Sequence, residues 1–186
     1  MDAELTQQVT QHAQRLAADG VCALGGLYDL VSDRLVRLAV AVTRNQHDAE
    51  DAVQGVLVRV GTEPELLLQA RCPWAYLLRM TRNAALEATR RRKRLLSLSS
   101  LTDLWVIRRV DQLDREETHR AVWQALRRLP TAQAEVVVLK IWEELTFAQV
   151  AEILDISPNT VASRYQYAMQ KLASRLGTLQ KELRHD

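Results

Sequence analysis

The chain has 186 residues, of which 47% are hydrophobic, and it carries 25 Lys and Arg against 23 Asp and Glu. A chain of this length forms one domain or two small ones, and its hydrophobic content can bury a core, which excludes wholesale disorder. No apolar run reaches the roughly 18 residues of a membrane span, and residues 1–4 do not begin a signal peptide. We therefore expect a cytoplasmic protein without membrane insertion.

Cysteine and histidine usage argues against a metal centre. Cys22 and Cys72 stand alone without a CxxC motif, so no disulfide framework is indicated. The four histidines are scattered without the spacing of metal ligands. Because there is also no nucleophile with a matching base and no glycine-rich phosphate loop, we expect a protein that is not an enzyme and needs no cofactor.

The formal net charge of +2 hides a division along the chain. Residues 1–65 hold five basic and ten acidic side chains, a net of −5, whereas residues 66–142 hold fifteen and seven, a net of +8. Residues 143–186 are close to neutral, with five basic and six acidic side chains, a net of −1. This division predicts one acidic surface for a protein partner and one basic surface for a polyanion.

Apolar residues recur every three or four positions, and glycine and proline are sparse, which predicts an all-α fold. The β-branched run at residues 136–139 could form a buried strand, but its flanks favour helix and a lone strand would have no partner. The pattern breaks at residues 95–115. We therefore predict an N-terminal helical extension (1–23), a helical domain (24–94), a flexible linker (95–115) and a second helical domain (116–180). The expected helices lie near residues 4–18, 24–44, 47–62, 73–94, 116–129, 132–143, 147–154 and 158–176.

The helix after Asn45 has an acidic outward face. Asn45 can cap the helix, and rotation by 100° per residue places Asp48, Asp51, Gly55 and Val58 on the side opposite the apolar residues. The two carboxylates lie near the helix N-terminus, where the helix dipole favours them. The face is either an ordinary solvated surface or a docking patch for a basic, partly apolar partner.

The helix that begins at Pro73 is strongly basic. From Arg79 to Arg94 there are seven basic residues and one acid, Glu87. Neighbouring cations repel, so the run at Arg90–Arg94 is costly unless an anion or solvent relieves it. Cations neutralise phosphates, and Tyr or Asn between them can contact unstacked bases, so nucleic acid is the favoured partner over a merely solvated face or an anionic membrane. The outward stripe comprises Tyr76, Arg79, Asn83, Leu86, Arg90 and Arg94.

A helix-turn-helix pattern lies near the C-terminus. Thr146 and Gln149 form a capping-box start to a short apolar helix, and Ser157 caps a second helix with Pro158 at its first position. Small and polar residues on the exposed half of the second helix suit entry into the DNA major groove. A structural helical hairpin would show a similar pattern.

Four blocks in this order resemble the extracytoplasmic-function sigma factors of bacterial RNA polymerase. They are Asp48–Gln54, Pro73–Asn83, Arg90–Arg94 and the segment from Leu129 to Arg164, which reads LTFAQVAEIL at residues 145–154 and NTVASR at residues 159–164. The likeness covers roughly Leu24 to Leu176. It implies an alternative sigma factor that binds core polymerase and promoter DNA, and family members are usually held by an anti-sigma partner.

The resemblance also implies a role for each surface. The acidic helix corresponds to the contact with the clamp coiled coil of the largest polymerase subunit, the basic helix to the element that opens the promoter and captures the −10 sequence, and the helix-turn-helix to the reader of the −35 element. The implied polymerase-binding residues are Asp48, Glu50, Asp51, Gln54 and Val58. The implied −10 residues are Tyr76, Arg79, Arg82, Asn83, Arg90 and Arg94, and the implied −35 residues are Ser157, Asn159, Thr160, Ser163, Arg164 and Tyr167.

Three departures from the family pattern and one alternative function stand beside this interpretation. Residues 1–23 have no counterpart in the family pattern. Gly55 replaces an acid that usually follows the Gln, and Asn159 replaces a Gly that commonly precedes Thr-Val. The alternative function is an autonomous helix-turn-helix repressor or activator. It would leave the acidic and basic helices without a role, so we expect the sigma function.

Overall fold

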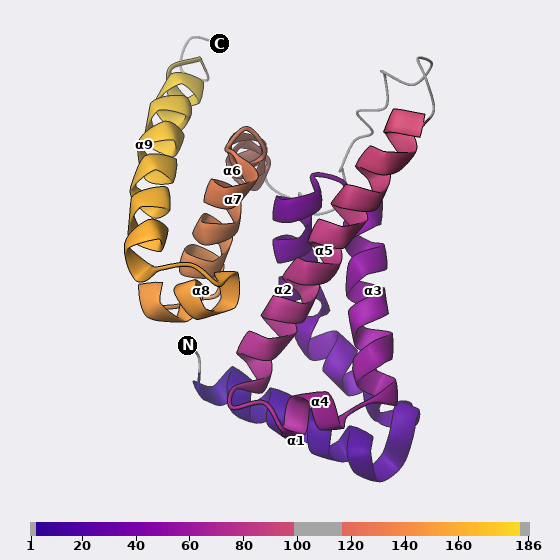
Figure 1. Ribbon diagram of the computed structural model, residues 1–186. Coiled ribbons are helices and arrows are strands. Elements are labelled where there is room, and N and C mark those ends of the chain that lie inside the picture. Colours follow the sequence, from indigo (N-terminus) through magenta and orange to yellow (C-terminus); the bar gives the residue numbers. More distant parts are fainter. Residues whose placement is uncertain (1–2, 99–116, 183–186) are drawn as a thin grey trace.

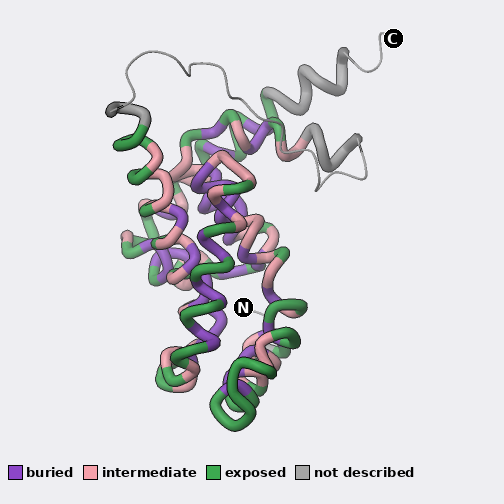
Figure 2. Tube along the Cα trace, turned by 90° about the vertical axis from the view of Figure 1, so that its right-hand side faces the viewer, coloured by how far each residue is buried: buried purple, intermediate pink, exposed green. Residues whose placement is uncertain are grey.

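The computed structural model describes residues 3–98 and 117–182, and the regular structure in these two ranges is entirely helical (Figure 1). The predicted all-α class is confirmed. Buried and exposed segments alternate along the helices, as expected for amphipathic helices that turn one face inward (Figure 2). No helix among the described residues is long and apolar enough to cross a membrane.

The N-terminal domain is built around three long helices. They are α2 (Leu24–Thr43), α3 (Gln46–Thr62) and α5 (Pro73–Leu98), which contact one another along much of their length. Their inward side chains are almost completely buried, and Trp74 at the start of α5 is the largest of them. Pro73 suits this first turn, where its missing N–H has no helical partner. A short helix, α4 (Glu65–Leu68), which the sequence pattern did not predict, connects α3 to α5.

Helix α1 (Ala3–Asp19) is part of this domain. It contacts α2, α4 and α5, and it buries Leu5, Val9, Ala13 and Leu16 at i, i+4, i+8 and i+11 spacing. A single turn of 3-10 helix, η1 (Gly20–Ala23), joins it to α2, and Gly20 adopts a φ of +71° at the bend. The predicted N-terminal extension is thus helical and supplies one side of the domain's core.

The C-terminal domain contains α6 (Glu117–Arg127), α7 (Thr131–Val137), a π-helical segment η2 (Val138–Trp142), α8 (Phe147–Leu154) and α9 (Pro158–Glu182). The β-branched run at residues 136–139 is helical, because all four side chains pack into the core from α7 and η2. Trp123 stacks on Trp142 with ring centroids 5.6 Å apart.

The end of α5 differs from the sequence prediction. The helix continues to Leu98, four residues past the predicted end at Arg94, so residues 95–98 are helical and not linker. The reason is local: Leu95–Leu98 contains no Gly or Pro that would stop a helix. The remainder of the predicted linker lies at residues 99–116, outside the described residues.

The two domains are in contact. Helix α7 and segment η2 lie against α2, and α8 lies against α5, so the orange and yellow helices stand beside the N-terminal bundle (Figure 1). This packing places acidic side chains of the C-terminal domain next to arginines of the N-terminal domain.

Candidate nucleic-acid interface

The N-terminus of helix α3 is capped as predicted, and the acidic face of the helix is exposed. The Asn45 side chain accepts a hydrogen bond from the Asp48 backbone N–H at 3.0 Å, which confirms the predicted cap. Asp51 is exposed, as are Gln54 and Val58, and the exposed fraction of Val58 reaches 60%. An apolar side chain this exposed beside carboxylates leaves a patch that a basic, partly apolar partner could cover.

Two of the predicted docking residues are already engaged within the domain. Asp48 accepts a hydrogen bond from Arg92 at 2.9 Å, and both side chains are partly buried. Glu50 accepts from the side chain of Gln46 at 2.6 Å. The Asp48–Arg92 pair ties the start of α3 to the basic end of α5, so Asp48 has a structural role whatever partner binds.

The basic run of α5 is partly neutralised within the domain. Glu87 lies 2.9 Å from Arg94 and 3.9 Å from Arg90, and Asp48 holds Arg92. Arg90 and Arg94 nevertheless stay largely exposed, with about 70% of each side chain accessible (71% and 69%). These ion pairs relieve the repulsion expected from five successive cations, while surplus positive charge remains at the surface.

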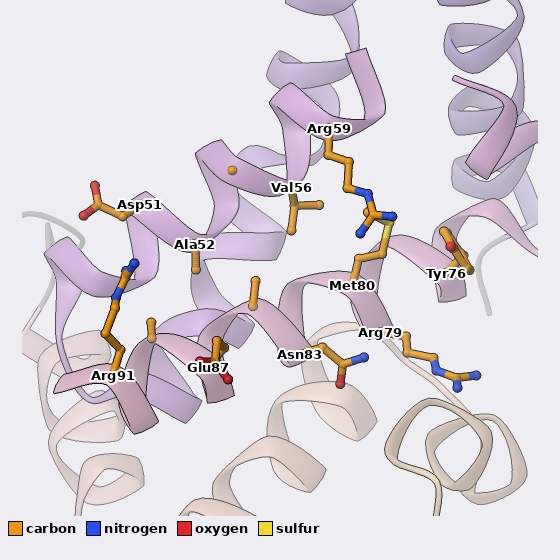
Figure 3. Close-up of a pocket in the computed structure, with 13 residues that line it drawn as sticks. Asp51, Ala52, Val56, Arg59, Tyr76, Arg79, Met80, Asn83, Glu87 and Arg91 are labelled. Carbon is orange, nitrogen blue, oxygen red and sulfur yellow. The ribbon is translucent and has the colours of Figure 1, made fainter. Parts of the chain in front are cut away.

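A groove of about 650 Å³ runs between α3 and α5 (Figure 3). Tyr76, Arg79 and Asn83 follow one another along its α5 wall, while Asp51 and Arg59 come from the facing α3 wall. Its floor is small and apolar, with Ala52, Val56, Met80, Ala84 and Ala88 among the lining residues. A tyrosine, an arginine and an amide around an apolar floor can stack on and hydrogen-bond an unstacked base.

Arg82, a predicted DNA-binding residue, does not share this groove. Its Nε donates to Glu135 of α7 at 2.8 Å, and only 18% of the Arg82 side chain and 4% of the Glu135 side chain are exposed. In this arrangement Arg82 therefore faces the C-terminal domain.

The helix-turn-helix forms as predicted. Thr146 and Gln149 make a complete capping box at the start of α8, and the left-handed conformation of Asp155 (φ 56°) turns the chain towards α9. Asn159, Ser163 and Tyr167 are exposed on α9, Thr160 and Arg164 are half-buried, and Val161 is buried. Ser157 accepts from the Thr160 backbone N–H at 3.1 Å, so this predicted DNA residue also caps the helix.

A second charged cluster joins the domains, and the sequence prediction missed it. The Glu143 side chain is fully buried between Arg34 (3.4 Å) and Arg37 (3.6 Å) of α2. Burial raises the pKa of Glu143, although the two arginines oppose the shift, and burial lowers the pKa of Arg37. The only sequence signal was a pair of acids, Glu135 and Glu143, set inside apolar stretches.

The matches to protein families fall on these two domains. Residues 27–95 match Sigma-70 region 2, and residues 119–172 match Sigma-70, region 4. The groove and the acidic face lie in the first match, and the helix-turn-helix lies in the second. The fold and the site thus define a protein of the sigma-70 class.

Individual relatives show which family within the sigma-70 class the chain belongs to. The chain is 32% identical to the ECF RNA polymerase sigma factor SigM of Mycobacterium tuberculosis, over 78% of this chain and 73% of the relative. It is 30% identical to the ECF RNA polymerase sigma factor SigL of the same species, over 88% of this chain and 94% of the relative. The protein therefore belongs to the extracytoplasmic-function sigma factors.

Solved structures share the fold. The sigma factor RpoE of Bartonella quintana, in complex with the anti-sigma factor NepR, has a TM-score of 0.66 at 22% identity over 81% of this chain and 94% of that chain. CnrH, in complex with the cytosolic domain of CnrY, has a TM-score of 0.62 at 24% identity over 91% and 97%.

Proposed function

We propose that this alternative sigma factor docks on core RNA polymerase through the exposed face of α3, captures the −10 element through the groove between α3 and α5, and reads the −35 element through α9. The protein itself supplies promoter specificity, and the polymerase supplies the chemistry. The observation that carries the proposal is the presence of an exposed acidic face on α3, a groove lined by Tyr76, Arg79 and Asn83, and a helix-turn-helix. Asp51 belongs to both the acidic face and the groove. Because RpoE of similar fold is bound to the anti-sigma factor NepR, we also propose an anti-sigma partner for this chain.

The function is tested by transcription with purified core polymerase on a promoter library, with and without this protein. We expect initiation at a small set of promoters only when the protein is present. Absence of protein-dependent initiation across the library would contradict the proposed function.

The docking surface is tested by reversing its charge. The double substitution Asp48→Lys, Asp51→Lys should abolish binding to core polymerase, because two cations would face a basic partner, while duplex DNA binding by the C-terminal domain should persist. Binding is measured with labelled core polymerase and with labelled duplex DNA in parallel.

Two single variants control this experiment. Asp51→Lys leaves the Asp48–Arg92 pair intact and should still weaken core binding. Glu65→Lys makes the same charge change at an exposed position on α4 and should bind core polymerase like the parent protein. Loss of duplex binding with retained core binding would mean that the surfaces are misassigned.

A further inference from the structure

Charge is unevenly distributed along the groove between α3 and α5. At one end Arg59 of α3 lies with Tyr76 and Arg79 of α5, on the right of Figure 3, and no acid lines this end. The other end is lined by two acids and one cation, namely Asp51, Glu87 and Arg91. A phosphate is therefore favoured at the end where two guanidinium groups lie without a carboxylate in the wall.

Arg59 is a cation that the proposed function does not use. In the described part of the chain its ion pair is with Glu63, at 3.9 Å, and 61% and 58% of the two side chains are exposed. An ion pair this long and this exposed contributes little, so a phosphate can replace the carboxylate at little cost. A cation also has the wrong sign for the basic partner proposed for the exposed face of α3. Arg59 therefore remains available for an anion in the groove.

Gly55 leaves Arg59 without a second acidic neighbour. It precedes Arg59 by four residues in α3, so the two positions lie side by side on the helix surface. An acid at position 55, where the family pattern usually has one, would stand in the favourable order for an i,i+4 ion pair with Arg59. Space does not require glycine here, because an added Cβ would meet no atom within 4 Å. The absent side chain thus affects the charge of the groove and not its packing.

We infer that Arg59 is a further DNA-binding residue, which together with Arg79 binds a backbone phosphate of the captured single strand, and that Gly55 leaves Arg59 free to do so. Guanidinium groups donate charge-assisted, often bidentate hydrogen bonds to phosphate oxygens. A phosphate held from both walls places the attached base beside Tyr76 and Asn83 in the same groove. The inference deepens the proposed function and rests on capture of the −10 strand by this groove.

The test uses holoenzyme assembled at saturating core polymerase. The probe is a fluorescently labelled single strand that carries the −10 region of a promoter selected in the transcription test, and anisotropy measures its affinity over a series of KCl concentrations. Arg59→Ala is compared with Arg59→Lys, which keeps the charge, and with Arg15→Ala, which removes a cation from an exposed position on α1 outside the groove. Core binding and circular dichroism are measured for every variant.

We expect Arg59→Ala to weaken binding of the strand about tenfold at low salt and to reduce the slope of log affinity against log salt by about 0.7, the value for one phosphate of a single strand. Arg59→Lys should keep the slope, because its ammonium still neutralises the phosphate. Arg15→Ala should bind the strand like the parent holoenzyme. All three variants should bind core polymerase normally.

The role of Gly55 is tested by adding the acid that this chain lacks. Gly55→Glu should weaken binding of the strand, whereas Gly55→Gln, of similar size and without charge, should not. In the Arg59→Ala background the two substitutions at position 55 should have the same effect, because the cation that the acid would neutralise is gone. An equal loss from Gly55→Glu in both backgrounds would mean general repulsion of DNA and would overturn this role.

Two results would overturn the assignment of Arg59. One is an unchanged salt slope in Arg59→Ala, and the other is loss of core binding by this variant, which would place Arg59 in the docking surface. Failure of the parent holoenzyme to initiate at any promoter or to bind the strand would count against the proposed function itself. The two failures are therefore distinguishable.

Discussion

Gly20 and Gly55 are both exposed glycines at which an added Cβ would meet no atom within 4 Å, yet their backbones differ. Gly20 has a φ of +71°, a conformation that L residues adopt only at a cost, whereas Gly55 lies inside the regular helix α3. The same substitution should therefore have opposite effects at the two positions. Because an added Cβ meets no neighbour at either glycine, the two substitutions measure backbone preference without a change in packing.

Gly55→Ala should raise the free energy of unfolding by up to about 1 kcal/mol, because alanine is the better helix former and meets no neighbour. Gly20→Ala should lower it by about 1 kcal/mol through left-handed strain. Urea denaturation followed by circular dichroism measures both. A destabilised Gly55→Ala variant would show that α3 requires glycine for a reason other than helix propensity.

At the scale of elements, α5 carries cations of two kinds. Arg92 is held by Asp48 across the α3–α5 contact and is 37% exposed, whereas Arg90 and Arg94 share the single carboxylate of Glu87 and are largely exposed. Exposed cations with shared counterions are the ones that can neutralise phosphates at little cost. We therefore expect Arg92 to stabilise the domain, and Arg90 and Arg94 to bind phosphates.

Replacing Arg90 and Arg94 with Ala should weaken promoter complexes and reduce the slope of log affinity against log salt by about 1.8, since two phosphate contacts would be lost. Holoenzyme binding to a labelled promoter over a salt series measures the slope. Arg92→Ala is the control on the same run. It should lower stability by loosening the α3–α5 contact and change the slope less; an equal change in slope would contradict this division.

At the scale of the whole molecule, Glu143 couples domain packing to pH. Burial raises the pKa of Glu143, and Arg34 and Arg37 oppose this shift. Folding therefore makes the ionised carboxylate less favourable relative to the protonated carboxyl than it is in the unfolded chain. Protonated Glu143 therefore contributes to the stability of the folded state. This contribution to the free energy of unfolding is fully present below the ordinary pKa of 4.5 and is lost as pH rises through the raised pKa. Acidification within this window should therefore favour the packed arrangement at this site.

Glu143→Gln imitates the protonated carboxyl and should be at least as stable as the parent protein at neutral pH. The difference in unfolding free energy between the two proteins should shrink as pH falls towards 4.5, because the parent carboxyl then becomes neutral as well. Taking the difference removes the contributions of the other titrating groups. A difference that widens on acidification would show that the ion pairs outweigh the cost of burial.

The helices, their caps and the faces that they expose follow from the sequence alone. Asn45, Thr146 and Ser157 cap as predicted, and Val58 and Tyr167 are exposed as predicted. These features depend on hydrogen bonds within four residues and on a periodicity of 3.6, so a linear sequence contains them. The continuation of α5 to Leu98 and the short α4 were missed, because helix ends depend on weak local preferences.

Which charged groups meet depends instead on tertiary packing. The resemblance implied a DNA-binding role for Arg82, and only the structure shows that its side chain pairs with Glu135, 53 residues away. Glu143 lies between two arginines more than 100 residues earlier in the chain. Such pairs are set by how the two domains pack, and no periodicity records them. The amphipathic patterns thus defined each surface, while domain packing determined which of those surfaces the protein leaves exposed.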